Sequence, residues 1–275
     1  MTHHADRARR GIEAAAQATE LLSAVVERLG DADMRAPSLL PGWSRAHVIT
    51  HLARNADGLV NLLSWARTGV EHPMYTSRED RDAAIAAGAL RGRLLLAEDL
   101  TAATRRFAVA AAGVPDSAWS ACLTDGRRRP LPAARVPWLR TREVWLHVVD
   151  LDAGVGFGDL PAALHAELLD DVVGEFRGRA DVPAVCVRAE LPDGTVRTYP
   201  LGGAAGGTSD GTARETEDDA APELPEDAPE APEDDTQDPP DGAVRGPSAD
   251  VLAWLTGRSP GTGLRGRVPV LPRWS

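Results

Sequence analysis

The sequence has no lysine, only two cysteines and no long apolar run, and each scarcity limits what the chain can be. All 30 residues counted as lysine or arginine are arginines. We interpret this as a coding bias, because nothing in the chemistry of a single domain would exclude lysine from every position. Cys122 and Cys186 form no CxxC motif, so we expect no disulfide framework and a reducing, cytoplasmic location. No run approaches roughly 18 apolar residues and the N-terminus has no apolar leader, which predicts neither a membrane span nor export.

Negative charge is concentrated in one segment, residues 208–241. This proline-rich segment holds 14 acidic residues and one arginine, and it leaves the rest of the 275-residue chain with a net charge of about +2 out of a total of −11. Leu224 is its only large apolar side chain, so it cannot bury enough surface to offset its ordering entropy, and we predict disorder. The remaining residues form no basic stripe of the kind that predicts nucleic-acid binding.

Apolar residues recur at helical spacing through the first two thirds of the chain. This pattern and its flanking cap residues predict helices at 6–29, 45–67, 79–87, 91–112, 138–151 and 161–179. Residues 118–134 are expected to form a loop or small hairpin, and His165 is expected to lie exposed on its helix. Two strand-like runs, 182–190 and 195–201, flank a Pro-Asp-Gly turn, and a short helix follows at 249–256. Residues 268–274 could add a last strand or an apolar packing arm.

The order of these elements predicts an α+β fold with two domains. A helical domain is expected over residues 1–179, followed by a small α/β domain over 180–275 that the acidic segment 208–241 interrupts. A chain of this length can bury a substantial core in each.

A possible metal site is indicated by three residues on two of the predicted helices. Glu143 and His147 are four residues apart, so a helix places both on one face, and the apolar residues around them indicate burial. His51 lies on an earlier helix and could supply a third ligand. Spacing alone leaves alternatives open, because Glu143 and His147 could form a simple surface pair, and His47, one turn from His51, suggests a competing His47/His51 pair.

Four motifs then occur in order: PGWSRAHVITHLARNAD (41–57), RDAAIAAGA (81–89), LRTREVWLHVVDLD (139–152) and ADVLAWLTGRS (249–259). Together they resemble the mycothiol-dependent maleylpyruvate isomerase family, over nearly the whole chain apart from the acidic segment, which looks like an extra insertion. The resemblance implies a DinB-like four-helix bundle followed by a small α/β domain.

The resemblance also implies a ligand set. In this family the metal, usually zinc, is held by the histidine that ends the WSRxHVxTH segment and by the glutamate and histidine of REVxxH, which are His51, Glu143 and His147 here. Arg258, in the WLTGR motif, resembles the substrate-handling arginine of the family. Arg81 is a second candidate for that work, although a helix-surface salt bridge would explain it equally well.

The chemistry implied by the resemblance is the cis–trans isomerisation of maleylpyruvate to fumarylpyruvate with mycothiol as thiol cofactor. Addition of a thiolate turns the double bond into a single bond, and rotation and elimination complete the isomerisation. A zinc ion would help because a free thiol with a pKa near ~8.5 is mostly protonated at neutral pH. Asp150 could orient a ligand imidazole. The expected partners are therefore mycothiol and a small-molecule carboxylate, with no nucleic acid or membrane, and we expect a monomer.

Two other functions fit the same residues. A mycothiol S-transferase would conjugate the thiol to an electrophile and stop there. A non-catalytic, metal-binding regulatory protein could keep the fold, with 208–241 as its docking tail, although a solvated spacer would explain that segment as well.

Overall fold

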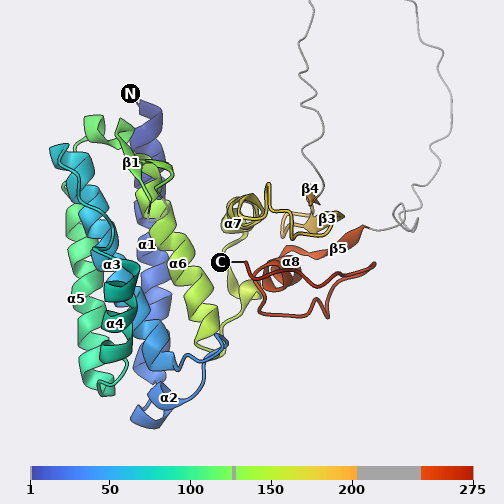
Figure 1. Ribbon diagram of the computed structural model, residues 1–275, viewed down its shortest axis with the longest axis horizontal. Helices are drawn as coiled ribbons and strands as arrows, with labels where there is room; N and C mark the ends of the chain where they lie inside the picture. Colours follow the sequence, from blue (N-terminus) through green and yellow to red (C-terminus); the bar gives the residue numbers. More distant parts are fainter. Residues whose placement is uncertain (1, 126–127, 203–242, 275) are drawn as a thin grey trace, which may run out of the picture. The chain divides into compact units, whose positions relative to one another are not determined.

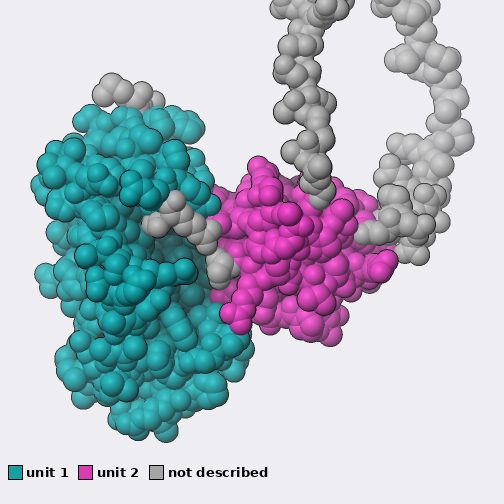
Figure 2. Space-filling view, viewed as in Figure 1, with its two compact units in different colours: residues 1–160 teal, residues 161–275 magenta. Residues whose placement is uncertain are grey.

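The computed structural model describes residues 2–125, 128–202 and 243–274. Its chain forms two compact units, and four long helices build the first of them (Figure 1). The units comprise Met1–Leu160 and Pro161–Ser275 (Figure 2). In unit 1 the long helices run alongside one another, with α3 packed most extensively on α5 and α1 on α6. Their bounds are α1 (Thr2–Arg28), α3 (Arg45–Thr68), α5 (Arg93–Ala112) and α6 (Val136–Asp150).

Shorter elements complete unit 1. They are α2 (Asp31–Arg35), α4 (Arg78–Gly88), the 3-10 turns η1 (Asp116–Ser120), η2 (Ala133–Arg135) and η3 (Phe157–Asp159), and the strands β1 (Cys122–Thr124) and β2 (Pro130–Pro132). The two strands pair antiparallel, so of the two structures expected for residues 118–134, a loop or a small hairpin, the second is found.

Local sequence explains where the helix carrying His51 begins and ends. Ser44 precedes α3 in an extended conformation, and Gly69 ends it with a φ of 72°, a left-handed conformation that favours glycine. Between these ends, α3 buries a continuous apolar face against its neighbours, including Val48, Leu52 and Leu59. Packing of this face therefore fixes the rotation of α3 about its axis, and with it the direction of His51.

Helix α4 approaches α3 unusually closely at one glycine. A Cβ atom added to Gly88 would lie 2.3 Å from Cγ2 of Thr50, a residue that is itself buried. Only glycine permits this approach without a shift of either helix. Because α4 also carries Arg81, the contact helps to bring that side chain beside α3.

The described residues of unit 2, 161–202 and 243–274, combine a three-stranded sheet with two helices. Its elements are α7 (Ala162–Gly174), β3 (Val185–Glu190), β4 (Val196–Leu201), β5 (Val244–Pro247) and α8 (Ser248–Leu255). The strand order is β4-β3-β5, with β3 antiparallel to β4 and parallel to β5. Helix α8 contacts β3, β5 and α7, so the apolar faces of helices and sheet form one core.

Most predicted elements are confirmed, including the α+β fold and the β3–β4 hairpin. The expected exposure of His165 is wrong, because the ring is buried and lies 2.7 Å from the Ser248 hydroxyl through Nδ1. Residues 268–274 add no strand; instead Trp274 donates from Nε1 to the carbonyl of Val172 at 3.3 Å, as a packing arm. The predicted disorder of 208–241 lies outside the described residues.

The sequence-based domain boundary and the compact units assign α7 differently. The helical pattern predicts a boundary after residue 179, whereas unit 2 begins at Pro161 and includes α7. The packing of α7 against α8 and β4 accounts for the assignment of this helix to unit 2. Among the described helices, none combines the length and apolar character that crossing a bilayer requires.

Candidate metal centre

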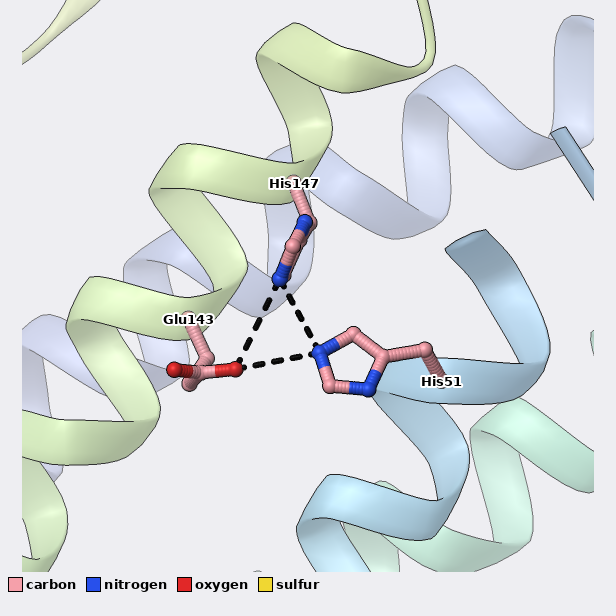
Figure 3. Close-up of side chains that lie close together, drawn as sticks. All are labelled: His51, Glu143 and His147. Carbon is pink, nitrogen blue, oxygen red and sulfur yellow. Dashed lines mark hydrogen bonds and ion pairs between the residues drawn. The ribbon is translucent and has the colours of Figure 1, made fainter. Parts of the chain in front are cut away.

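Three side chains from two helices of unit 1 converge on one point (Figure 3). Nε2 of His51, on α3, lies 2.9 Å from Nε2 of His147 and 3.1 Å from Oε2 of Glu143, both on α6. The third side of the triangle, from His147 Nε2 to Glu143 Oε2, measures 3.6 Å. The predicted trio is therefore brought together, with one potential ligand atom of each residue facing the other two.

Helical geometry and packing produce this convergence. Glu143 and His147 are one turn apart on α6, so both side chains leave the same side of that helix, toward α3. Val144 and Val148, each the next residue along, are fully buried and hold α6 in the bundle core. The third residue comes from α3, a direct packing partner of α6.

The competing histidine pair is not brought together in this way. His47 turns back to the start of α3, where its Nδ1 accepts a hydrogen bond from the backbone N–H of Ser44 at 3.2 Å and lies 2.8 Å from the Ser44 hydroxyl. The imidazole thus takes part in capping α3, while His51 faces α6. Residues one turn apart share a helix face, so His47 would have to leave Ser44 and adopt another rotamer before both rings could face one ion.

A buried carboxylate orients His147. Oδ2 of the fully buried Asp150 lies 2.8 Å from Nδ1 of His147. Because a carboxylate only accepts hydrogen bonds, the proton of the neutral ring must sit on Nδ1, which leaves the Nε2 lone pair directed at the other two side chains. This arrangement is typical of histidines that bind metal ions.

Burial and mutual charge shift the pKa values of all three residues. Burial, together with the nearby charge of His147, lowers the pKa of His51 to about 4. Burial alone would raise the pKa of Glu143, but hydrogen bonds and charge from His147 and His51 hold it well below its usual range. Burial would lower the pKa of His147, but hydrogen bonds to Asp150 and Glu143 outweigh burial and raise it. Glu143 is therefore ionised and His51 neutral near pH 7.

The donor set fits a zinc-like divalent ion. Two imidazole nitrogens and one carboxylate oxygen are ligands that zinc accepts, and three protein ligands leave a position open for a reactant. Ligand atoms about 2.0–2.1 Å from a tetrahedral ion lie about 3.3 Å apart. The observed separations of 2.9, 3.1 and 3.6 Å bracket that spacing.

Two arginines border the three side chains. On α4, Arg81 lies with Nη2 3.1 Å from Nδ1 of His51, and its guanidinium sits 5.7 Å from the centre of the Tyr75 ring. On α6, Arg142 lies with Nη2 3.5 Å from Oε1 of Glu143. Arg81 is one of the two arginines that the sequence nominates for substrate handling. Arg142 is not among them, although its position next to Glu143 in the REVxxH motif is a signal that could have found it.

Arg258 belongs to unit 2. It follows α8, and its Nη1 donates to the carbonyl of Thr256 at 2.6 Å. The expected action of Arg258 on a substrate at the unit 1 site stays a proposal.

Comparisons with known proteins agree with the resemblance in the sequence. The model of the family described as mycothiol maleylpyruvate isomerase N-terminal domain matches residues 15–152, which include the three candidate ligands. Two crystal structures, of the mycothiol-dependent maleylpyruvate isomerase and of a histidine-to-alanine mutant of it, each match with a TM-score of 0.78 and 28% identity over 100% of both chains. No curated protein matches the chain.

Proposed function

The chain belongs to the mycothiol maleylpyruvate isomerase family, and on that premise we propose that it converts maleylpyruvate to fumarylpyruvate with mycothiol as its thiol cofactor. The observation that carries this proposal is the convergence of His51, Glu143 and His147 within the region that the family model matches. Similarity over the full length to a solved isomerase supports the same activity.

In this proposal His51, Glu143 and His147 hold a zinc ion. The bound ion would lower the pKa of the mycothiol thiol, so that a thiolate is present to add reversibly to the substrate double bond and permit rotation. The protein's own contribution is orientation. Asp150 keeps the proton of His147 on Nδ1, and packing of α3 on α6 keeps His51 opposite Glu143.

The substrate carboxylates need cationic partners, and we assign this work to Arg81 and Arg258. A guanidinium binds a carboxylate through two parallel hydrogen bonds, which fixes its orientation as well as its position. Arg81 already lies at the candidate metal centre, with Nη2 3.1 Å from Nδ1 of His51. We further propose that the enzyme acts as a monomer in the cytoplasm, as mycothiol and a small carboxylate substrate require no other partner.

The test is turnover of maleylpyruvate by zinc-loaded protein, with and without mycothiol, beside two matched variants. His51→Ala removes a proposed ligand, whereas His47→Ala removes an imidazole one turn away that faces the helix cap. We expect thiol-dependent formation of fumarylpyruvate that His51→Ala abolishes and His47→Ala retains.

Other outcomes separate the two rival functions. Consumption of mycothiol with a generic electrophile, without isomerisation, would identify an S-transferase. Stoichiometric zinc binding with neither reaction would identify a non-catalytic metal-binding protein. Equal loss of isomerisation in both histidine variants would mean that stability, not the candidate metal centre, limits activity.

A further inference from the structure

The two candidate histidine ligands have opposite kinds of partner on their second ring nitrogen. Nδ1 of His147 faces a carboxylate oxygen of Asp150 at 2.8 Å, which can only accept a hydrogen bond. Nδ1 of His51 faces Nη2 of Arg81 at 3.1 Å, which can only donate one. The first partner suits a metal ligand, because ligating histidines donate from their other nitrogen to a carboxylate, carbonyl or water. The second partner does not.

The position of one proton on His51 follows from this contact. Nδ1 accepts from Arg81 and therefore carries a lone pair, so the single proton of the neutral ring sits on Nε2. That proton points toward Oε2 of Glu143 at 3.1 Å and Nε2 of His147 at 2.9 Å. Both can accept, the latter because Asp150 holds the His147 proton on Nδ1. Each proton in this network has an acceptor.

A metal ion reverses these requirements. Ligation through Nε2 of His51 needs a lone pair there, so the proton of the neutral ring must move to Nδ1. The N–H group on Nδ1 would then face the N–H of Arg81 at the observed 3.1 Å, a contact between two donors. The Arg81 hydrogen bond and ligation by His51 cannot coexist on one neutral ring.

We infer that Arg81 is a positioning residue that competes with the metal ion for His51, and that binding of the ion releases its guanidinium to hold a substrate carboxylate. Arg81 is free to make this exchange. Its side chain is 24% exposed, and it keeps other contacts, a 2.7 Å ion pair with Asp82 and the face of Tyr75. Leaving His51 therefore breaks one hydrogen bond without unfolding α4.

This exchange would link the two binding events. If the ion frees Arg81, and the freed guanidinium binds a carboxylate, the carboxylate must by reciprocity strengthen binding of the ion. The carboxylate step rests on the proposed function, whereas the competition at His51 does not. The competition can therefore be tested with protein and zinc alone.

The first measurement is the position of the His51 proton, read from long-range ¹H–¹⁵N spectra of ¹⁵N-labelled full-length protein. The pH is set so that the imidazoles are neutral, and the His51→Ala variant assigns the signals. With a chelator we expect Nδ1 of His51 to lack a proton, and with one equivalent of zinc we expect Nδ1 to carry it. An Nδ1 that stays unprotonated in the zinc complex would overturn the inference, whether or not the protein proves to be an isomerase.

The second measurement is zinc affinity, from competition with a chromophoric chelator. Arg81→Met removes a donor from His51, and Arg142→Met removes an equal charge beside Glu143 and serves as the control. We expect Arg81→Met to bind zinc about tenfold more tightly than the wild type, the effect of one charge-assisted hydrogen bond, and Arg142→Met to gain much less. Equal gains in zinc affinity in both variants would mean that the loss of a positive charge alone explains the tighter binding, and would contradict competition at His51.

Discussion

Oδ2 of Asp150 lies 2.8 Å from Nδ1 of His147, and the carboxylate is fully buried. This contact keeps the proton of a neutral His147 ring on Nδ1, so that its Nε2 lone pair faces His51 and Glu143. We expect Asp150→Asn to weaken zinc binding by about 10–100-fold, because the neutral amide accepts more weakly and can offer a donor instead. Chelator competition measures the change.

Asp152 provides the matched control for this substitution. Its side chain is exposed, and its φ of 48° is a conformation that asparagine tolerates well. Asp152→Asn should leave zinc affinity within about twofold of the wild type. An equal loss in both variants would show that the effect is not specific to the His147 contact.

Zinc binding should weaken as the pH falls. Burial lowers the pKa of His147, but hydrogen bonds to Asp150 and Glu143 outweigh burial and raise it above its ordinary value. The ion must displace that proton, so affinity should fall by up to about tenfold per pH unit below the raised pKa and level off above it. His51, with a pKa of about 4, adds a second proton only in stronger acid.

The Asp150→Asn variant also tests the cause of this pH dependence. Removal of the carboxylate removes a contribution that raises the pKa of His147, so the region of falling affinity should move to lower pH. Chelator competition over a pH series would show the shift. An unmoved profile would mean that another group carries the displaced proton.

The close approach of α4 to α3 should make Gly88→Ala destabilising. The alanine Cβ would lie 2.3 Å from Cγ2 of Thr50. Overpacking of this kind lowers the free energy of unfolding by about 1–3 kcal/mol. This loss exceeds the ~1 kcal/mol by which alanine stabilises a helix relative to glycine. Thermal unfolding in a chelator should show a lower Tm. Thr50→Ser removes the colliding methyl group and should restore much of the loss. Gly174→Ala, in a helix with open space, should not destabilise.

Local pattern predicted the helices and the Glu143/His147 pair, because helical spacing alone places both residues on one face. It left open whether His51 joins Glu143 and His147 or forms a competing pair with His47. Both histidines lie on one face of α3, so the outcome depends on which turn of α3 lies opposite Glu143, a contact between residues 92 positions apart. The resemblance of the motifs, not the spacing, selected His51.

Two other features of the structure, the burial of His165 and strand β5, also depend on contacts between residues distant in sequence. His165 is buried because Ser248, 83 positions away, partners its ring, which no local pattern records. Strand β5 was not anticipated because its four residues, VRGP, include glycine and proline, and its parallel pairing with β3 comes from tertiary structure. Contacts between residues distant in sequence therefore determine the burial of His165 and the formation of β5, which local secondary-structure propensity does not predict.

Arg258→Ala should separate substrate binding from metal binding. If Arg258 holds a substrate carboxylate, its loss removes a charge-assisted hydrogen bond worth about 1.5–3 kcal/mol, so kcat/KM for maleylpyruvate should fall by about 10–150-fold. Zinc affinity should not change, since the three candidate ligands lie in unit 1. Arg267→Ala, which removes an exposed arginine of unit 2, should leave both quantities near wild-type values. A loss of zinc binding in Arg258→Ala would instead assign this residue a structural role, because a carboxylate-binding arginine has no effect on the ion when substrate is absent.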